Sequence, residues 1–272
     1  MIVFPNCKIN LGLQVLRKRS DGYHDLQTVF YPISLHDALE VIESGNTTNL
    51  HVSGNVINTE PEENICIKAF NLLKKDFTTL PTIDIYLHKT IPSGAGLGGG
   101  SADGAFMLLL LNSKFNLKLS ESDLLHYALQ LGSDCPFFIK NVPSLATGRG
   151  EGLRSVTLTL SEYSIVLVNP GINVSTAWAF SQLRPEEDRE ELIEIIQLPL
   201  SQWKENVHND FEEPIFRKYP EIKKVKEALY SKGAVYASMT GSGSTVYGLF
   251  EKQHQPQFDF PAHYFQVRIG LH

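Results

Sequence analysis

The sequence is poor in cysteine, in long hydrophobic runs and in basic charge, and each shortage excludes a class of protein. Its cysteines, Cys7, Cys66 and Cys135, are odd in number and widely spaced, so they predict neither a disulfide framework nor a CxxC metal pair. The longest apolar run, Ala105–Leu111, is too short to cross a membrane. The N-terminus lacks the basic and apolar regions of a signal peptide. We therefore expect a cytoplasmic protein that has no membrane partner.

Acidic residues outnumber basic ones, 30 to 24, which gives a net charge of −6 at pH 7. A chain of that charge is a poor candidate for a nucleic-acid-binding protein. Its nine histidines show no HExxH or comparable spacing, so no metal site is predicted. A length of 272 residues suits one large domain or two modest ones.

What the chain does have is an unusual density of glycine in IPSGAGLGGGSADGA, residues 91–105. Five of the seven residues 94–100 are glycine. Residues 82–92 alternate apolar and polar side chains and predict a half-buried strand, and the apolar run after the glycines predicts a helix capped by Ser101 or Asp103. Exposed backbone N–H groups before a helix bind anions, because the helix dipole adds positive potential. The pattern predicts a phosphate-binding loop between a strand and a helix.

Other readings of this loop fit less well. The nucleoside-triphosphate loop GxxxxGK[ST] needs a lysine after its last glycine, and none is present. The dinucleotide pattern GxGxxG matches Gly94, Gly96 and Gly99, but it expects an acidic residue at the end of a second strand about 20 positions further on. That region, Leu119–Asp123, begins a predicted helix instead. A flexible linker is disfavoured by the strand and apolar helix on either side.

The remaining pattern mixes strands and helices without βαβ alternation, which predicts an α+β protein of two domains. The loop-rich segment 141–155 is the expected junction, which gives domains 1–154 and 155–272. A second glycine cluster, residues 239–250, predicts a hairpin turn between two strands. Strands are predicted at 2–4, 9–16, 37–43, 48–53, 82–88, 164–169, 234–240, 244–250 and 263–269, and helices at 64–77, 101–114, 120–131, 175–183, 186–197, 201–211 and 219–232.

Two charged residues stand in apolar surroundings. Lys8 lies on a predicted strand in PNCKINLGL, and a buried lysine needs a carboxylate or a ligand anion. Asp134 precedes the apolar run Pro136–Ile139, where a carboxylate needs a cation or a function. The segment RSDGYHDL places Tyr23 and His24 after an Asp-Gly turn, which alone could be an ordinary surface turn.

Together these segments form an ordered pattern: PxxKINLGL, DGYHxL, PxxxGLGGGSxD, GxDxPFF and MTGSGS. This pattern closely resembles the GHMP kinase superfamily. DGYHDL, PNCKINL and the NDFE at 209–212 narrow the resemblance to the branch that phosphorylates the 2-hydroxyl of 4-diphosphocytidyl-2-C-methyl-D-erythritol in the non-mevalonate isoprenoid pathway. It implies an N-terminal α+β ATP-binding domain, a C-terminal ferredoxin-like α/β sandwich, and a monomer or weak homodimer that uses ATP and Mg²⁺.

Three other functions stay open from the sequence. The chain could be a superfamily kinase acting on mevalonate, homoserine or a sugar, although DGYH argues against these acceptors. It could be a nucleotide-binding protein without activity, or, most remotely, a dinucleotide oxidoreductase.

The resemblance also implies site residues. Lys8 and Asp134 correspond to the catalytic pair, in which the aspartate accepts the proton of the attacking hydroxyl. His24 corresponds to the hydrogen-bond partner of cytosine, and Tyr23 and Phe180 to the rings stacked on its two faces. The implied ATP-binding residues are Pro92, Gly94, Ala95, Gly96, Leu97, Gly98, Gly99, Gly100, Ser101, Asn64 and Lys68, and the implied substrate-binding residues are Asn10, Tyr23, His24, Thr176 and Phe180.

The chain departs from the family pattern at two places. Many members have Ser-Ser where this chain has Ser101–Ala102, which removes one candidate hydroxyl contact but leaves the backbone loop unchanged. Cys7 and Cys135 flank the implied catalytic pair, and we expect one of these thiols to make the enzyme sensitive to alkylation.

Overall fold

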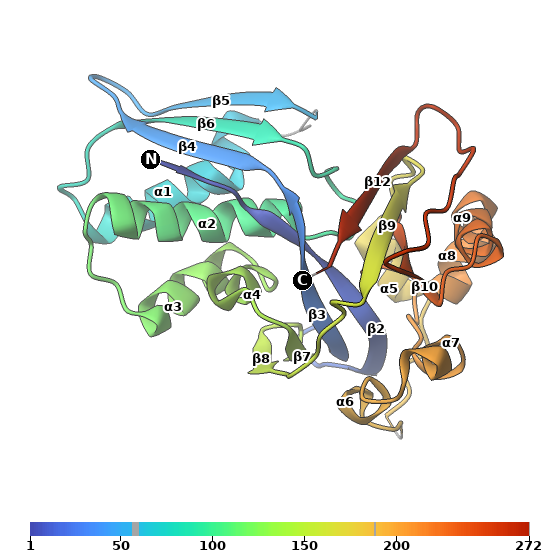
Figure 1. Cartoon of the computed structure of the whole chain (residues 1–272). Helices are drawn as coiled ribbons and strands as arrows, with labels where there is room; N and C mark the ends of the chain where they lie inside the picture. Colours follow the sequence, from blue (N-terminus) through green and yellow to red (C-terminus); the bar gives the residue numbers. More distant parts are fainter. Residues whose placement is uncertain (56–59, 188, 272) are drawn as a thin grey trace. The chain divides into compact units, whose positions relative to one another are not determined.

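The computed structural model describes residues 1–55, 60–187 and 189–271, and its chain forms two compact units (Figure 1). Neither unit is one continuous stretch. Unit 1 contains Met1–Cys7, Leu35–Ser93 and Gly98–Val142, and unit 2 contains Lys8–Ser34, Gly94–Leu97 and Pro143–His272. Both units mix helices and strands, as expected of an α+β protein. The predicted boundary after residue 154 falls within unit 2, and as a division between family domains it stays a prediction.

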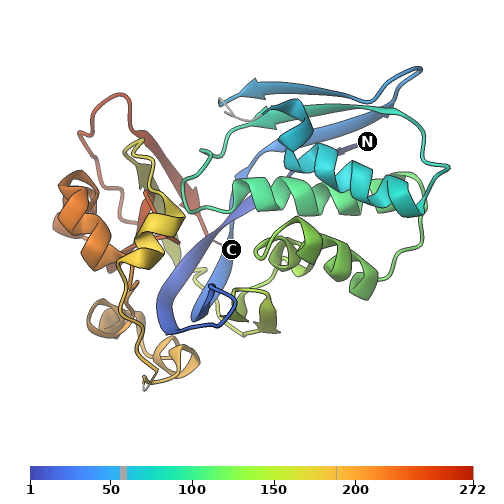
Figure 2. The ribbon, with the colours of Figure 1, turned by 180° about the vertical axis from the view of Figure 1, so that it is seen from behind.

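Unit 1 holds a four-stranded sheet and four α-helices. Its elements are β1 (Ile2–Val3), β4 (Ala38–Glu43), β5 (Asn49–Gly54), a 3-10 turn (Pro61–Glu63), α1 (Ile65–Asp76), β6 (Ile83–Lys89), α2 (Gly99–Lys114), α3 (Glu121–Leu131) and α4 (Cys135–Lys140). The strand order is β1-β4-β6-β5, with β5 parallel to β6 and the other pairs antiparallel. Figures 1 and 2 show α1 and α2 along the sheet, with α3 and α4 beyond α2.

Helix α2 is covered on several sides, which explains the apolar run that predicted it. Ala105, Leu108 and Leu111 are completely buried. A Cβ atom at Gly104 would lie 2.7 Å from Cγ1 of Ile65, so glycine allows α1 to approach closely.

The predicted strand, glycine loop and helix at 82–114 are confirmed. The predicted cap is wrong, because α2 begins at Gly99 and both Ser101 and Asp103 lie within the helix. Gly98 stands at the N-cap position without a side-chain hydrogen bond.

Unit 2 contains two further four-stranded sheets. Their strands are β2 (Asn6–Lys18), which begins in unit 1, β3 (His24–His36), β7 (Ser144–Gly148), β8 (Gly152–Ser155), β9 (Tyr163–Asn169), β10 (Tyr236–Met239), β11 (Val246–Glu251) and β12 (Phe265–Gly270). The helices are α5 (Thr176–Ser181), α6 (Leu192–Ile195), a 3-10 turn (Leu200–Gln202), α7 (Trp203–Asn206), α8 (Glu212–Lys218) and α9 (Pro220–Ser231). The strand orders are β2-β3-β7-β8 and β10-β11-β9-β12.

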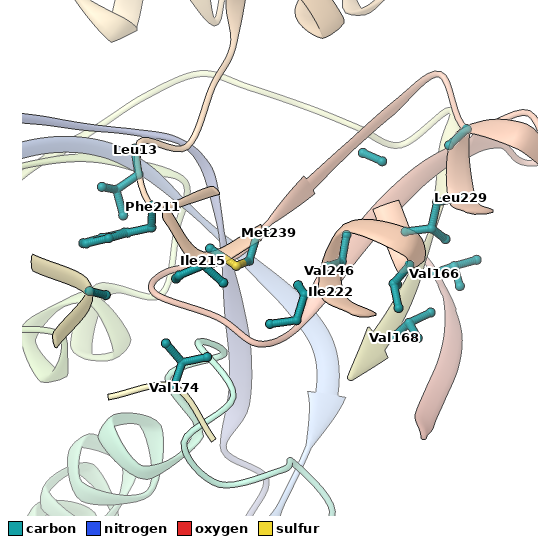
Figure 3. Close-up of a cluster of buried hydrophobic side chains, with 14 of the residues drawn as sticks. Leu13, Val166, Val168, Val174, Phe211, Ile215, Ile222, Leu229, Met239 and Val246 are labelled. Carbon is teal, nitrogen blue, oxygen red and sulfur yellow. The ribbon is translucent and has the colours of Figure 1, made fainter. Parts of the chain in front are cut away.

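The second of these sheets has the expected ferredoxin-like arrangement of strands. All of its neighbouring strands are antiparallel, and the chain from β9 to β10 includes α9, which packs on the sheet. Residues 252–264 join β11 to β12 without a helix, so a loop replaces the second helix of the βαββαβ motif. Val166, Ile215, Leu229 and Val246 are buried in the core between this sheet and its helices (Figure 3).

Several elements differ from those predicted. The segment 141–155 is not a simple junction, because it contains β7 and β8. Its glycines form the turn between these two strands, where Gly148 and Gly150 have positive φ of 69° and 113°. Strand β3 was not predicted, because the middle of it is buried on both faces and shows no alternation. The helix predicted at 201–211 ends at Asn206, and α8 begins at Glu212.

Across the described ranges, no helix is long and apolar enough to span a membrane.

Candidate active site

The glycine loop has the backbone geometry of an anion-binding turn. Gly94, Gly96 and Gly98 have φ of 65°, 78° and 71°, each separated by one residue. Turns in which left-handed residues recur can direct successive backbone N–H groups toward one side and form a concave site for anions. Gly98 is also the residue that precedes the first turn of α2, so the positive end of a 16-residue helix begins here.

The second glycine cluster packs directly against the first part of this loop. Residues 240–245 connect the antiparallel strands β10 and β11, which confirms the predicted hairpin. A Cβ atom at Gly96 would lie only 2.1 Å from the carbonyl oxygen of Thr240. The Thr240 hydroxyl lies 3.1 Å from the Gly96 carbonyl oxygen, and the Thr245 amide donates to the Ala95 carbonyl at 3.3 Å. The hairpin therefore supports the shape of residues 94–97.

Lys8 lies beside the same residues. Its side chain is buried, and its ammonium donates to Oδ1 of Asn10 at 2.8 Å and to the Gly96 carbonyl at 3.2 Å. Its backbone amide donates to the Leu97 carbonyl at 3.0 Å, and its Nζ atom lies 4.8 Å from the centre of the Phe30 ring. Strand β2 thus places a cation next to the predicted phosphate-binding backbone.

Asn10, predicted to contact substrate hydroxyls, has its side chain engaged within the protein. Its Nδ2 donates to Thr28 at 2.9 Å, and its Oδ1 accepts from Lys8 and lies 3.1 Å from the Thr240 hydroxyl. Its backbone amide donates to that hydroxyl at 3.0 Å. Only 3% of Asn10 is exposed. These contacts make it a support for Lys8, and its contact with substrate stays a prediction.

The aromatic residues predicted to hold cytosine also come together in unit 2. The ring of His24 stacks on Phe180, with centres 4.9 Å apart and planes at 16°, and Phe180 meets the edge of Phe211 at 4.9 Å. Tyr23 is 56% exposed, and the Arg149 guanidinium lies 5.0 Å from its ring centre. Burial lowers the pKa of His24, and the charge of Lys18 lowers it further, so the imidazole is neutral at neutral pH.

Thr176 and Arg149 complete this group. Thr176, the first residue of α5, lies with its hydroxyl 3.0 Å from that of Ser242 in the β10–β11 hairpin. The sequence did not predict a role for Arg149. Residues 148–152, GRGEG, indicate only a loop, and nothing in them shows that Arg149 contacts the ring of Tyr23.

In unit 1, Asp134 stands next in sequence to a residue that contacts Ser101. Asp134 precedes the first turn of α4, is half-buried and makes no capping hydrogen bond with its side chain. The next residue, Cys135, has a thiol in hydrogen-bond contact with Ser101 on α2. Lys8 and Asp134 belong to different units, so their pairing as catalytic residues stays a prediction.

The expected sensitivity to alkylation does not fit the structure. Cys7 and Cys135 are both completely buried. Burial raises the pKa of the Cys135 thiol to about 12, although a hydrogen bond with Ser101 acts in the opposite direction. A thiol reacts as its thiolate, so Cys135 is unreactive at neutral pH.

The remaining predicted ATP residues have clear local roles in unit 1. Asn64 caps α1, accepting a hydrogen bond from the Cys66 amide at 2.9 Å. Lys68 is exposed and paired with Glu63. Pro92 follows the end of β6. None of these contacts tests the predicted binding of adenine.

Sequence reasoning missed a buried charge cluster at the base of the loop. Lys89 lies between the carboxylates of Asp37 and Asp103, and the three side chains are at most 2% exposed. Asp37 also accepts from the backbone amides of Thr90 at 2.6 Å and Ile91 at 2.8 Å. The cluster ties the chain before the glycine loop to the first turns of α2. Burial raises the pKa of Asp103 to about 7; Lys89 opposes this rise and Asp37 adds to it.

Replacing Lys89 by methionine is expected to lower the free energy of unfolding by about 3–5 kcal/mol, because it leaves two buried carboxylates without their cation. Asp103→Asn should lower the free energy of unfolding far less at pH 8, since it removes one of the two negative charges.

The folded protein holds the Asp103 proton more tightly than the unfolded chain does, so Asp103 makes the free energy of unfolding fall as the pH rises from about 4 to 7. Urea unfolding across this range should show that slope reduced in Asp103→Asn; equal losses in both variants at pH 8 would contradict the account.

Within the part of the chain that the structure describes, no three His, Cys, Asp or Glu side chains gather closely enough to hold a metal ion.

Comparison with known proteins gives a consistent result. Family models of the GHMP kinases N terminal domain and the GHMP kinases C terminal region match residues 64–141 and 181–259. The chain is 54% identical to the 4-diphosphocytidyl-2-C-methyl-D-erythritol kinase of Bacteroides fragilis, over 99% of this chain and 100% of that protein. It is 48% identical to the protein of the same name from Cytophaga hutchinsonii, over 92% of each chain.

Solved structures agree with these relatives. A crystal structure of 4-(cytidine 5'-diphospho)-2C-methyl-D-erythritol kinase superposes with a TM-score of 0.79 at 34% identity, covering 92% of this chain and 90% of that one. A homoserine kinase from Cytophaga hutchinsonii superposes with a TM-score of 0.66 at 18% identity, covering 92% and 86% of the two chains, which shows likeness of fold alone.

Proposed function

This chain belongs to the GHMP kinase family, and from that membership we propose that it transfers the γ-phosphate of ATP to the 2-hydroxyl of 4-diphosphocytidyl-2-C-methyl-D-erythritol. The observation that carries the proposal is the position of Lys8. Its ammonium lies 3.2 Å from the Gly96 carbonyl, in the same unit as the stacked pair His24 and Phe180. A cation beside the proposed phosphate-binding backbone and an aromatic surface for a base are two of the elements that this reaction needs.

The loop suits the ATP phosphates because its left-handed glycines expose backbone N–H groups at the start of α2. Mg²⁺ would arrive with these phosphates and neutralise part of their charge, since it is usually held by substrate phosphates, waters and few protein groups. Ser101, in the first turns of α2, is the hydroxyl best placed to contact the metal or a phosphate.

In the transfer step, Asp134 accepts the proton that the substrate hydroxyl loses as its oxygen attacks the γ-phosphorus. From the family resemblance we infer that Lys8 would keep that carboxylate ionised and offset negative charge on the transferring group. Because phosphoryl transfer passes through a loose transition state, positioning and charge stabilisation contribute more than the strength of the base. The contacts of Lys8 with Asn10 and Gly96 hold the ammonium in one place for this purpose.

The cytosine is held by the aromatic group. Phe180 and Tyr23 offer ring faces for stacking, and His24, neutral at neutral pH, hydrogen-bonds the polar edge of the base. Hydrogen bonds to a base edge discriminate between bases more strongly than stacking does. Thr176, on the same helix as Phe180, has its hydroxyl beside that of Ser242 in the β10–β11 hairpin, and we propose that it lies near the substrate.

His24→Ala is expected to raise the KM for the cytidine substrate about 5- to 150-fold, the range that follows from losing a hydrogen bond of about 1–3 kcal/mol. The KM for ATP should change little, because His24 contacts aromatic rings and not the glycine loop. Steady-state kinetics with each substrate varied in turn measures both. His36→Ala, an exposed histidine at the other end of β3, is the control. Equal effects of His24→Ala on both KM values would contradict its role.

Release of ADP across a panel of acceptors tests the proposed function. We expect turnover with 4-diphosphocytidyl-2-C-methyl-D-erythritol and none with mevalonate, homoserine or a sugar. Preference for one of those acceptors would favour another kinase of the family. Binding of ATP without ADP release on any acceptor would favour a protein without activity.

We also propose that the enzyme works in the cytoplasm as a monomer or weak homodimer with only small-molecule partners. Its net charge of −6 supports the absence of a nucleic-acid partner. Light scattering coupled to size-exclusion chromatography should give a mass near that of one or two chains; a stable larger assembly would contradict this.

A further inference from the structure

The segment Asn209–Glu212, with sequence NDFE, lies between two parts of the candidate site in unit 2. It pairs with β2 through Leu13, which donates to the His208 carbonyl at 2.9 Å and accepts from the Asp210 amide at 2.9 Å. The Asp210 carboxylate also accepts from the Val15 amide at 2.7 Å. The segment is thus fixed to the strand that carries Lys8.

Asn209 connects this fixed segment to the β10–β11 hairpin. Its Nδ2 donates to the carbonyl of Met239 at 2.8 Å and to that of Gly241 at 2.9 Å, which uses both amide hydrogens. Its Oδ1 accepts from the Phe211 amide at 3.0 Å. Only 3% of the residue is exposed, so water does not compete for these bonds. No other side chain type combines two such donors with an acceptor in this size.

The residue between the two held carbonyls is Thr240. Its hydroxyl lies 3.1 Å from the Gly96 carbonyl and 3.1 Å from Oδ1 of Asn10. The carbonyl oxygen of Thr240 also packs against Gly96, so closely that a Cβ atom at Gly96 would collide with it. Asn10 in turn accepts from Lys8. Any shift of Thr240 therefore moves both the phosphate-binding backbone and the support of the ammonium.

Two neighbours of Asn209, Phe211 and Glu212, also attach the NDFE segment to β10, through Met239. Glu212 is 9% exposed, and its carboxylate accepts from the Met239 amide at 2.8 Å and from Lys226 at 2.6 Å. Phe211 packs with Met239 and Leu13 in the core cluster (Figure 3). These contacts fix the end of β10, and Asn209 extends the attachment to Gly241, within the hairpin itself.

We propose that Asn209 is a positioning residue for phosphoryl transfer, which acts by holding Thr240 against Gly96 and Asn10. The inference rests on the proposed function, and it goes beyond it by giving the NDFE segment a part in the reaction. Asn209 itself need not touch either substrate. Its effect should appear in kcat and in ATP binding, and not in recognition of the cytidine substrate.

The test compares three variants for kcat, for both KM values and for the dissociation constant of ATP by calorimetry. Asn209→Asp keeps the shape and the acceptor but replaces the amide donor by a carboxylate. Asn206→Asp makes the same change at an exposed amide that donates to one carbonyl, and is the control. Thr240→Val removes the hydroxyl without changing charge. A misplacement of about 1 Å can cost about a hundredfold in rate.

We expect Asn209→Asp and Thr240→Val each to lower kcat and ATP affinity tenfold or more, with the KM for the cytidine substrate within twofold of wild type. The double variant should lose little beyond the larger single loss, because both changes break one chain of contacts. Losses that multiply in the double variant would overturn the proposal, as would wild-type kcat in Asn209→Asp at a temperature where the variant is folded. If Asn209→Asp does not fold, a Thr240→Val variant with wild-type kcat and ATP affinity overturns it alone.

The calorimetric measurement separates this inference from the proposed function, because ATP binding needs no acceptor. Wild-type protein without turnover on the cytidine substrate would count against the proposed function. Unchanged ATP affinity in both Asn209→Asp and Thr240→Val would count against the positioning role, whatever the acceptor.

Discussion

Asp134→Asn is expected to lower kcat by about 10²- to 10⁴-fold, the contribution typical of a positioned general base. Asparagine has the same size but cannot take the proton from the attacking hydroxyl. We expect a loss toward the lower end of that range, because a loose phosphoryl-transfer transition state depends less on base strength than on charge and position. The affinity for ATP should stay within twofold, since we propose that the glycine loop, and not Asp134, binds the phosphates through its backbone amides.

Steady-state ADP release and calorimetric ATP binding measure these two effects. Asp259→Asn makes the same change at an exposed position in the loop between β11 and β12, and should be silent. Thermal unfolding should show the Asp134→Asn protein folded at the assay temperature. An Asp134→Asn enzyme with kcat within twofold of wild type would remove Asp134 from the mechanism.

Gly96→Ala is expected to lower kcat/KM for ATP by about a hundredfold or more, because the added methyl group would move the backbone that we propose as the phosphate-binding site. Its Cβ would lie 2.1 Å from the Thr240 carbonyl oxygen, a backbone atom that cannot turn away. Gly96 also has φ of 78°, a left-handed conformation that costs an alanine about 1–2 kcal/mol.

Gly94→Ala separates these two causes. Gly94 has a similar φ of 65°, but a Cβ there meets no protein atom within 4 Å. This variant should show the cost of the conformation alone, and hence a much smaller loss. Thermal unfolding should show both proteins folded at the assay temperature. Equal losses in kcat/KM for ATP would mean that contact with the β10–β11 hairpin does not shape the loop.

The fold class and the central loop could be predicted because their signals are local. A strand of alternating side chains, a dense run of glycines and an apolar helix stand next to one another between residues 82 and 114, and the structure has them in that order. Strand β3 gave no such signal, because it is buried on both faces over its middle. The strands β7 and β8 were not predicted, because the glycines of the turn between them indicated a loop.

The supports of the site could not be read from local pattern, because their partners lie far apart in the chain. Asn10 meets Thr240 across 230 positions, and Lys89 meets Asp37 across 52. The motif at 209–212 helped to identify the branch of the superfamily, but its hydrogen bonds to the hairpin appear only in three dimensions. The stacking of His24 on Phe180 likewise joins β3 to α5, although the family resemblance had already implied a role for both residues.

The central claim is that this site phosphorylates 4-diphosphocytidyl-2-C-methyl-D-erythritol with ATP. Its most direct test is the rate of ADP formation with and without that acceptor, measured in parallel on the wild-type protein and on Asp134→Asn. The account predicts ADP formation that depends on the acceptor, yields one phosphorylated acceptor for each ADP, and is almost lost in the variant. ADP formation that is the same with and without the acceptor, or none with it, would contradict the account.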